Sequence, residues 1–393
     1  MNMKKLLSCF VYAGYAVGYI FACAVGLFAR YLPCYKDLWL VSERKTDARD
    51  NGLHFFKYMC NNHPEINCAF IITEKSPDYQ KVKNLGRVIK PHTFSHMLAF
   101  ACAKVRISTH YMGCAPDSYR FAVMNRIGLV RGKNVLLRHG ITANDLKELH
   151  YPAARVELMV CSAVPEYEFM KKNYNQPDGV IKRLGLCRYD RLLSPHIEKK
   201  QILIMPTWRY FLRNLSDEEF KKSDYFKNFY DILNSDRLQK KLNEHGYDII
   251  LYLHYELQKY SKLFEVDKPN IKTASLESAD VQQLLMESSL LITDYSSIFF
   301  DFAYMSKPLL YLQFDEEKFY ATQYARGYFS CRRDGFGPVV KSSDEAVDFV
   351  IQKLNDEMKL DEIYQKRAAD FFGERSCDHC QKTYEEIRKI LKA

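Results

Sequence analysis

The stretch from residue 290 to 315, LLITDYSSIFFDFAYMSKPLLYLQFD, restricts the fold more than any other part of this 393-residue chain. Its apolar run at 290–292 is typical of a buried strand, and the next residues, TDYSS, are mostly types that cap helix N-termini. Residues 298–305 have the length of a short helix, which a Lys-Pro pair ends before a second apolar run at 309–312. The pattern predicts a strand–helix–strand unit. The start of its helix carries free N–H groups that suit a phosphate, and an ordinary capped helix is the alternative.

The rest of the chain repeats this alternation of short apolar runs with longer amphipathic stretches, which is typical of parallel sheets covered by helices. Strands are predicted at residues 38–41, 69–72, 88–89, 105–108, 135–137, 156–160, 202–205, 248–253, 290–292, 309–312 and 339–340. Helices are predicted over residues 51–60, 94–102, 226–242 and 298–305, with a further group within 343–391. The fold class is therefore α/β, with two Rossmann-type doubly wound domains.

A Ser-Pro pair at 194–195 and a polar stretch after it separate the two sets of strands. We predict a hydrophobic membrane-associating segment at residues 1–35, an N-terminal domain at 36–195 and a C-terminal domain at 196–393. Doubly wound sheets bind ligands outside the carboxyl ends of their strands, so we expect both domains to face one interdomain cleft. Polar side chains follow the predicted strands at His139, Arg209, His254 and 293–297, and this placement predicts a shared site.

Residues 6–29 carry no charge and are long enough to cross a membrane as a helix. Four glycine or serine residues and three tyrosines interrupt the apolar run. The alternatives are a single-pass anchor, a helix lying in the membrane plane, a signal peptide and a buried first helix of the domain. We expect membrane association, with the mode of association left open.

The net charge of +9 fits an acidic substrate or an anionic membrane surface. Nucleic acid is not an expected partner, because the Lys and Arg residues are dispersed and no nucleic-acid-binding motif is present. Twelve cysteines without a repeating frame indicate reduced thiols in a reducing compartment, which argues against export. The stretch at 377–380, CDHC, has no second cysteine pair, so we interpret it as a helix end and predict no metal site.

Several motifs together resemble the CDP-glycerol glycerophosphotransferase family, which includes teichoic-acid polymerases, primases and capsule-associated relatives. The matching residues are His139-Gly140, Gly185-x-x-Arg188-x-Asp190, Pro206-Thr207-Trp208-Arg209, His254, Thr293 to Ser297, Asp301-Phe302, Lys307-Pro308 and Gly337 to Val340. The chain departs from the family pattern at Arg138, at Ile141-Thr142, at Tyr255 and at Asp378-His379, where many members carry Trp, Thr-Pro, Pro and Asp-Gly.

The resemblance implies a GT-B-like fold with an acceptor-side N-terminal domain and a CDP-alditol-binding C-terminal domain. The implied reaction transfers an alditol phosphate from CDP-glycerol or CDP-ribitol and releases CMP, and glycerol phosphate is the expected group. The acceptor is a hydroxyl of a lipid-linked primer or of a growing teichoic-acid or capsule-type polymer. The resemblance implies no cofactor and a location on the cytoplasmic side of the cell membrane, and it leaves a homo-oligomer open. The alternatives are a GT-B glycosyltransferase that uses a nucleotide sugar in cell-surface polysaccharide synthesis, and a membrane-anchored scaffold protein.

Histidine titrates near neutral pH, so we predict His139 as the base that deprotonates the acceptor hydroxyl. His254 is predicted to bind or protonate the leaving phosphate. The residues predicted to bind substrate are Gly140, Arg188, Thr207, Arg209, Thr293, Asp294, Ser296, Ser297 and Asp301. Arginine can pair with phosphate in a fork and hydroxyls can donate to pyrophosphate, whereas the two aspartates are expected to support their neighbours, because an ionised carboxylate repels phosphate.

Overall fold

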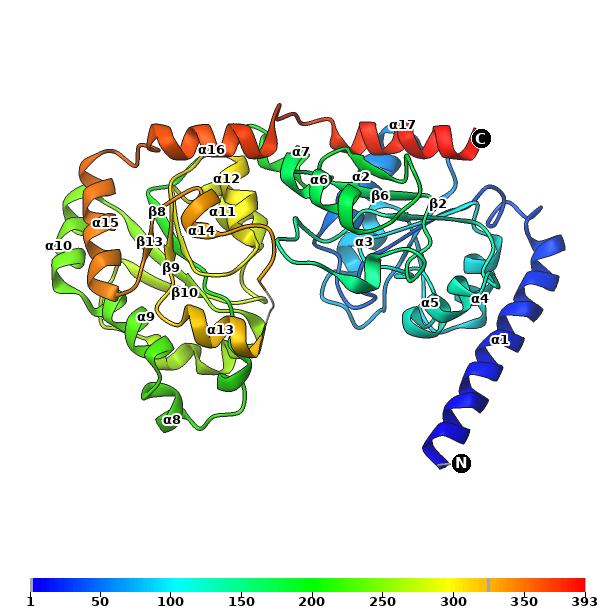
Figure 1. Cartoon of the computed structure of the whole chain (residues 1–393), viewed down its shortest axis with the longest axis horizontal. Helices are drawn as coiled ribbons and strands as arrows, with labels where there is room; N and C mark the ends of the chain where they lie inside the picture. The colour runs from blue at the N-terminus through cyan, green and yellow to red at the C-terminus, as the bar shows by residue number, and fades with distance from the viewer. Residues whose placement is uncertain (1–2, 324–325, 393) are drawn as a thin grey trace. The chain divides into compact units, whose positions relative to one another are not determined.

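The computed structural model describes residues 3–323 and 326–392, with side chains from Val11 onward. The chain divides into two compact units, each built on its own sheet (Figure 1). The first unit contains the chain up to Ile141, Leu146–Arg191 and the C-terminal stretch from Ser376, and the second contains Thr142–Asp145 and Leu192–Arg375. The predicted α/β class with two doubly wound sheets is confirmed.

The first unit contains a seven-stranded parallel sheet with the order β3-β2-β1-β4-β5-β6-β7. Its strands are β1 Trp39–Ser42, β2 Cys68–Ile71, β3 Arg87–Ile89, β4 Val105–Ser108, β5 Lys133–Leu136, β6 Leu158–Cys161 and β7 Ile181–Arg183. The strands β1, β4 and β6 are buried along their length because helices cover both faces of the sheet. The strand order reverses between β1 and β4, which is where a sheet of this topology opens for a ligand.

The helices of the first unit form two layers around this sheet. They are α1 Met3–Ala29, α2 Asn51–Asn62, α3 Tyr79–Leu85, α4 Phe94–Cys102, α5 Ser118–Arg126, η1 Lys147–Leu149, α6 Val164–Asn173, α7 Tyr189–Leu192 and α17 His379–Lys392. α2, α3 and α17 pack on the face that carries Val41 and Ile107, and α1, α4 and α5 pack on the opposite face. α6 covers the part of the sheet formed by β5, β6 and β7.

The second unit contains a six-stranded parallel sheet with the order β10-β9-β8-β11-β12-β13. Its strands are β8 Gln201–Ile204, β9 Asp248–Tyr252, β10 Ile271–Ala274, β11 Leu290–Thr293, β12 Leu309–Leu312 and β13 Val339–Val340. The strand order reverses between β8 and β11. The strands β10 and β7 were not predicted from the sequence. Both lie at sheet edges, and each carries an exposed or half-exposed lysine or arginine in place of a continuous apolar run.

Helices cover both faces of the second sheet as well (Figure 1). They are η2 Tyr210–Leu212, α8 Asp217–Lys221, α9 Asp224–Asn234, α10 Asp236–His245, η3 Tyr255–Phe264, α11 Val281–Glu287, α12 Ile298–Tyr304, α13 Glu316–Thr322, α14 Cys331–Asp334, α15 Ser343–Asn355 and α16 Glu362–Phe372. α9, α10 and α15 share one apolar core with the strands, while Phe299 of α12 packs on Tyr311 from the other face. Ser235 caps α10, and Gly246 ends it in the left-handed conformation that favours glycine.

The C-terminal helix α17 belongs to the first unit, whereas the sequence-based division placed residues 196–393 together in the second domain. The carboxylate of Asp190 accepts the backbone N–H groups of His379 and Cys380 at 2.8 and 2.9 Å, so it satisfies two free donors at the start of α17. Gly185 has a φ of +79°, and a Cβ there would collide with the ring of His379. Two residues of the predicted Gly-x-x-Arg-x-Asp motif therefore hold the C-terminal helix.

We expect Asp190→Ala to destabilise the first unit by about 1–3 kcal/mol, because two N–H groups at the start of α17 lose their acceptor. Urea denaturation followed by circular dichroism would measure the change. Asp378→Ala is the matched control, since Asp378 lies beside the same helix end and its partly exposed side chain pairs with Lys382. Equal urea midpoints for the two variants would contradict the capping role of Asp190.

Candidate active site

His139 and His110 follow neighbouring parallel strands at the carboxyl edge of the first sheet. His110 follows β4 and His139 follows β5. Their imidazole rings stack with centroids 4.9 Å apart and planes 1° from parallel. Within the described part of the chain, the ring of His139 makes no hydrogen bond, so its nitrogens are available to a ligand.

The His139 imidazole is held in its neutral form. The residue keeps contact with solvent, but the surrounding protein atoms remove part of the hydration of the ring, and this desolvation lowers the pKa of His139 to about 4. The charges of Arg138, Arg188 and Arg44 lower the pKa further. A ring with a pKa well below 7 has one unprotonated nitrogen at neutral pH, so it can accept the proton of an attacking hydroxyl.

Asn51 fixes the chain next to His139. This buried side chain donates through Nδ2 to the carbonyl of Arg138 at 2.8 Å, and its Oδ1 accepts the backbone N–H of Arg188 at 3.0 Å. Arg138 has a φ of +62°, which is uncommon for a residue other than glycine. Its guanidinium lies 2.9 Å from the carboxylate of Glu166 in a buried ion pair. The residue before His139 is therefore held at both its backbone and its side chain.

Arg188 lies beside His139, and its guanidinium contacts neighbouring protein groups. Its Nη1 is 2.8 Å from Oδ1 of Asp50 and donates to the carbonyl of His139 at 3.0 Å. Gly140 is buried, and a Cβ at that position would meet the guanidinium of Arg188 at 3.5 Å. The predicted group of His139, Gly140 and Arg188 is thus brought together, with Arg188 orienting the backbone of the other two.

In the second unit, His254 follows β9 and stacks on Trp208, which follows the neighbouring strand β8. The ring centroids are 5.9 Å apart and the planes differ by 18°. The backbone N–H of Glu256 donates to Nδ1 of His254 at 3.3 Å. Because Nδ1 acts as the acceptor, the ring carries a proton on Nε2, and a ring N–H is a group that can donate to a phosphate oxygen.

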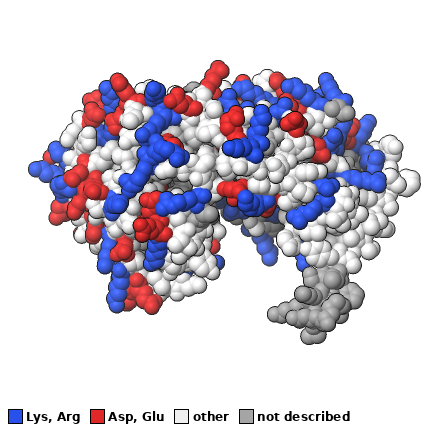
Figure 2. All heavy atoms as spheres, in the orientation of Figure 1, with Lys and Arg blue, Asp and Glu red and all other residues white. Residues whose placement is uncertain are grey.

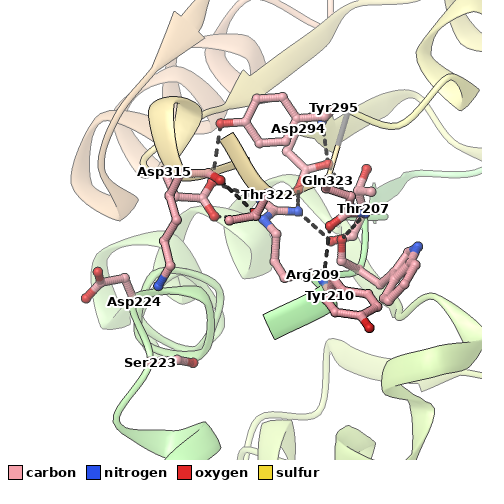
Figure 3. A network of polar contacts seen from close by, with 12 residues as sticks. Thr207, Arg209, Tyr210, Ser223, Asp224, Asp294, Tyr295, Asp315, Thr322 and Gln323 are labelled. Carbon is pink, nitrogen blue, oxygen red and sulfur yellow. Dashed lines mark hydrogen bonds and ion pairs between the residues drawn. The ribbon is translucent and has the colours of Figure 1, made fainter. Parts of the chain in front are cut away.

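Arg209 lies at the centre of a buried network in the second unit (Figure 3). Its Nη1 is 2.9 Å from Oδ2 of Asp294, and its Nε and Nη2 donate to the two carboxylate oxygens of Asp315 at 2.7 and 3.0 Å. Burial alone would lower the pKa of Arg209, but Asp294 and then Asp315 raise it above its ordinary value. The sequence assigned the guanidinium fork to a phosphate, whereas in the structure the carboxylate of Asp315 occupies it.

Asp294 and Thr293 tie the ends of β8 and β11 together. Oδ1 of Asp294 accepts the backbone N–H groups of Thr207 and Tyr295 at 2.8 and 2.6 Å (Figure 3). The hydroxyl of Thr293 donates to the carbonyl of Met205 at 2.7 Å, so Thr293 contacts protein. The side-chain hydroxyl of Thr207 is buried and has no hydrogen-bond partner within the described residues, which is uncommon for a buried polar group.

Ser296 is half-buried and Ser297 is exposed at the start of α12. Ser297 is the N-cap residue, and its side chain makes no capping hydrogen bond. Asp301 is buried within α12, so it is placed to support the helix. The strand ends at Thr207, His254 and Ser296 belong to the three adjacent strands β8, β9 and β11.

Several residues that shape these strand ends were not predicted from the sequence. His110 follows a predicted strand, as His139 does, so its position in the sequence is a signal that could have identified it. Asp315 and Gln323 gave no such signal. Oε1 of Gln323 accepts the N–H of Tyr210 at 3.0 Å, and its Nε2 donates to the carbonyl of Trp208 at 3.1 Å (Figure 3). Gln323 therefore fixes the loop after β8 from a distant part of the chain.

Among residues 3–323 and 326–392, no group of three or more His, Cys, Asp or Glu side chains is arranged to hold a metal ion. The CDHC stretch forms the start of α17, where Nδ1 of His379 lies 2.7 Å from the carbonyl of Leu184. The buried thiol of Cys380 contacts the carbonyl of Cys187. These contacts place the stretch at a helix end, as predicted.

Two doubly wound parallel units, each with polar residues at the carboxyl ends of its central strands, define a GT-B-like fold. A family model for CDP-Glycerol:Poly(glycerophosphate) glycerophosphotransferase matches residues 27–389, and the chain belongs to this family. The resemblance seen in the sequence motifs is thereby confirmed.

The minor teichoic acid biosynthesis protein GgaB of Bacillus subtilis strain 168 is 31% identical over 366 residues, which cover 90% of this chain and 40% of that protein. The teichoic acid poly(glycerol phosphate) polymerase of Staphylococcus epidermidis strain RP62A is 27% identical over 353 residues, which cover 84% of this chain and 46% of that protein. The chain thus spans less than half of the length of either relative.

Among solved structures, the wall teichoic acid polymerase TagF superposes with a TM-score of 0.69 at 16% identity, over 100% of this chain and 99% of that one. UDP-GlcNAc 2-epimerase from Neisseria meningitidis superposes with a TM-score of 0.54 at 11% identity, over 90% of this chain and 99% of that one. Both likenesses concern the fold.

Proposed function

We propose that this chain transfers an alditol phosphate, with glycerol phosphate preferred, from a CDP-alditol to an acceptor hydroxyl and releases CMP. The acceptor is a lipid-linked primer or a teichoic-acid or capsule-type polymer. The observation that carries the proposal is the position of the His139 ring, which follows β5 at the carboxyl edge of the first sheet and makes no hydrogen bond within the described residues. Desolvation and the charges of Arg138, Arg188 and Arg44 lower the pKa of this ring to about 4, which suits a base. Membership of the glycerophosphotransferase family and the printed names of the teichoic-acid relatives support this reaction class.

The proposed step begins when the acceptor O–H bond breaks and its proton moves to a ring nitrogen of His139. The acceptor oxygen forms a bond to the phosphorus that carries the alditol. The bond from that phosphorus to the bridging oxygen of the pyrophosphate breaks, and its electron pair stays on the phosphate of CMP. The Nε2–H group of His254 donates a hydrogen bond to the leaving phosphate and stabilises the negative charge that develops there. The proposal thus assigns the incoming oxygen to His139 and the departing oxygen to His254.

Donor binding is assigned to the second unit. The buried hydroxyl of Thr207, which has no partner within the described residues, and the side chains of Ser296 and Ser297 are proposed to donate to the pyrophosphate. Arg209, Thr293, Asp294 and Asp301 are buried. We propose that these four residues hold the binding loops in place without contacting the donor.

A panel of donors tests the proposal. The purified protein would be incubated with a lipid-linked primer and with labelled CDP-glycerol, CDP-ribitol or UDP-GlcNAc, and label in the acceptor would be counted. We expect label from a CDP-alditol, with glycerol preferred, and none from UDP-GlcNAc. Incorporation from the nucleotide sugar alone would contradict the proposal and favour the alternative, a GT-B glycosyltransferase. No incorporation from any donor would favour a binding protein.

We expect the double variant Ser296→Ala and Ser297→Ala to bind CDP-glycerol about ten- to hundredfold more weakly, because two hydroxyl donors to a charged phosphate are lost. Isothermal titration of CDP-glycerol into the protein would measure the affinity. Ser275→Ala combined with Ser278→Ala is the matched control, since these hydroxyls bond to each other on an exposed turn of the same unit. Unchanged affinity in the first variant would remove the two serines from the donor site.

We propose that α1 lies along a membrane surface with its apolar outer face in the lipid. Val11–Ala29 is long and apolar enough to cross a membrane, by length and composition only. One side of α1 packs on α4, with Tyr19 and Ala22 buried and the backbone at Gly26 close to the thiol of Cys102. The hydroxyl of Tyr19 also accepts the backbone N–H of Arg131. A helix held along its side by the domain favours an in-plane position over a spanning one.

The outer face of α1 exposes apolar side chains. Ile20, Leu27 and Phe28 are 55%, 57% and 80% exposed. Residues 11–29 include no Lys, Arg, Asp or Glu, and the face of this stretch that is visible in Figure 2 is white. We expect the triple change of these three residues to Gln to weaken binding to phosphatidylglycerol vesicles by about a hundredfold or more, because each buried side chain contributes about 1.5–3 kcal/mol. Vesicle co-sedimentation would measure the loss.

The control for this variant changes Ile197, Leu276 and Ile363, three exposed apolar residues outside α1, to Gln. It should bind vesicles as the unchanged protein does. If the α1 variant also binds vesicles normally, the proposed in-plane contact is wrong.

A further inference from the structure

We propose that His110 is a positioning residue for His139, whose ring it holds by stacking. Its effect on catalysis rests on the proposed function of His139 as the base. No motif singled out His110, and nothing in the family resemblance assigns it a role. The proposal concerns only residues of the first unit.

The stacked arrangement is what orients the ring of His139. A centroid distance of 4.9 Å between planes only 1° from parallel corresponds to offset stacking, a favourable geometry for aromatic rings. Within the described residues no hydrogen bond holds either nitrogen of His139. The backbone on either side of the ring is fixed through Arg138 and Arg188, so the stacking contact controls the remaining freedom of the side chain.

His110 is itself held firmly enough to act as a support. Its Nδ1 lies 2.9 Å from the hydroxyl of the buried Thr109. Its carbonyl accepts the hydroxyl of Ser108 at 2.7 Å and the backbone N–H of Gly113 at 2.9 Å. Its ring and its backbone are therefore fixed by residues at the end of β4 and directly after it. A ring that is itself held in place can support the ring stacked on it.

The charges around the pair allow it to hold at most one proton near neutral pH. Arg44 lies near both rings, Arg138 and Arg188 act on His139, and the carboxylate of Asp50 acts on His110. Desolvation first, and then the neighbouring His139, lowers the pKa of His110 to about 4. Two imidazolium ions at stacking distance would repel each other, so His110 must stay neutral when His139 takes the proton of the acceptor.

Variants of His110 separate a positioning role from a purely structural one. His110→Ala removes the stacked ring, and His110→Phe keeps an aromatic face that cannot titrate. His63→Ala is the matched control, because it removes a histidine that stacks on Tyr384 elsewhere in the same unit. CMP release would be measured with CDP-glycerol and a lipid-linked primer. The protonation midpoint of His139 would be measured without substrate by NMR of labelled histidine, with the signal assigned by its loss in His139→Ala.

For His110→Ala we expect kcat to fall about ten- to hundredfold and KM for the donor to stay within about twofold. The midpoint of His139 should rise by about one pH unit, because the exposed ring regains hydration. His110→Phe should keep most of kcat and a low midpoint, and His63→Ala should match the unchanged protein in both measurements.

Two results would overturn the proposal. An unchanged protonation midpoint of His139 in His110→Ala would show that the stacked ring does not set the environment of His139. This result would not depend on which donor the protein uses. A kcat in His110→Phe as low as in His139→Ala would show that His110 itself moves the proton. The NMR midpoint needs no turnover, so it tests the positioning role even if the protein releases no CMP.

Discussion

Replacing His139 with alanine is expected to leave a folded protein whose CMP release falls about a hundred- to ten-thousandfold. The variant loses the neutral imidazole that accepts the proton of the acceptor hydroxyl, while the contacts of Asn51 and Arg188 to the neighbouring backbone remain. Donor affinity should change little, because we assign donor binding to the second unit. CMP release would be followed with CDP-glycerol and a lipid-linked primer, and donor affinity by titration calorimetry.

His196→Ala is the control for this variant, because His196 is an exposed histidine whose ring bonds only the nearby carbonyl of Ser194. It should release CMP at the normal rate. Near-normal turnover in His139→Ala would remove His139 from the proposed mechanism.

The pH dependence of kcat/KM is a second test of the role of His139 as the base. Since desolvation and the three arginines hold the pKa of His139 near 4, the base is unprotonated above about pH 5. We therefore expect kcat/KM to be flat from about pH 5 to 7 and to fall at lower pH with a midpoint near 4. The anionic donor should raise the pKa in the complex, so the midpoint of kcat should lie higher. A fall in kcat/KM centred near 6.5, the ordinary value for histidine, would contradict the assignment.

The second large effect is expected at Arg209. Arg209→Met should destabilise the second unit by about 3–5 kcal/mol, because two carboxylates in a buried position lose their counter-charge. Asp294 is fully buried, and Asp315 loses both bonds of its fork. Urea denaturation followed by tryptophan fluorescence would measure the change, since Trp208 lies next to this network. The stability of Arg209→Lys should lie between that of the unchanged protein and that of Arg209→Met, because an ammonium group keeps the positive charge but cannot form the two-pronged contact with Asp315.

Arg213→Met is the matched control, since Arg213 forms a half-exposed ion pair with Glu256 and surface pairs contribute about 0–1 kcal/mol. If Arg209→Met is as stable as this control but no longer binds CDP-glycerol, the guanidinium contacts the donor as the sequence first suggested, and the structural role assigned to it here is wrong.

The sequence predicted the features that depend on local periodicity. Apolar runs with Val, Ile and Leu on both faces predict buried parallel strands wherever helices cover a sheet, and most strands of both units were found in this way. The stretch from residue 290 to 315 forms β11, α12 and β12, as its pattern predicted. Polar residues at strand ends were also found, because the carboxyl edge of a parallel sheet is where such residues collect.

Roles that depend on distant parts of the chain were not predictable. Arg209 and Asp315 are 106 residues apart, so a motif that contains the arginine cannot reveal that a carboxylate fills its fork. Asp190 caps a helix that begins at His379, and no local pattern joins the C-terminal helix to the first unit. The pairing of His110 with His139 required knowing that β4 and β5 are neighbours. Such contacts between distant residues form only when the chain folds.

The most direct test of the proposed phosphate transfer follows the β-phosphate of the donor. CDP-glycerol labelled with ³²P in the phosphate that carries glycerol would be incubated with the protein and a lipid-linked primer. The proposed chemistry breaks the bond between this phosphorus and the bridging oxygen, so the label should appear in the acceptor and the released CMP should be unlabelled. Release of labelled CDP, with an acceptor that gains glycerol but no ³²P, would contradict it.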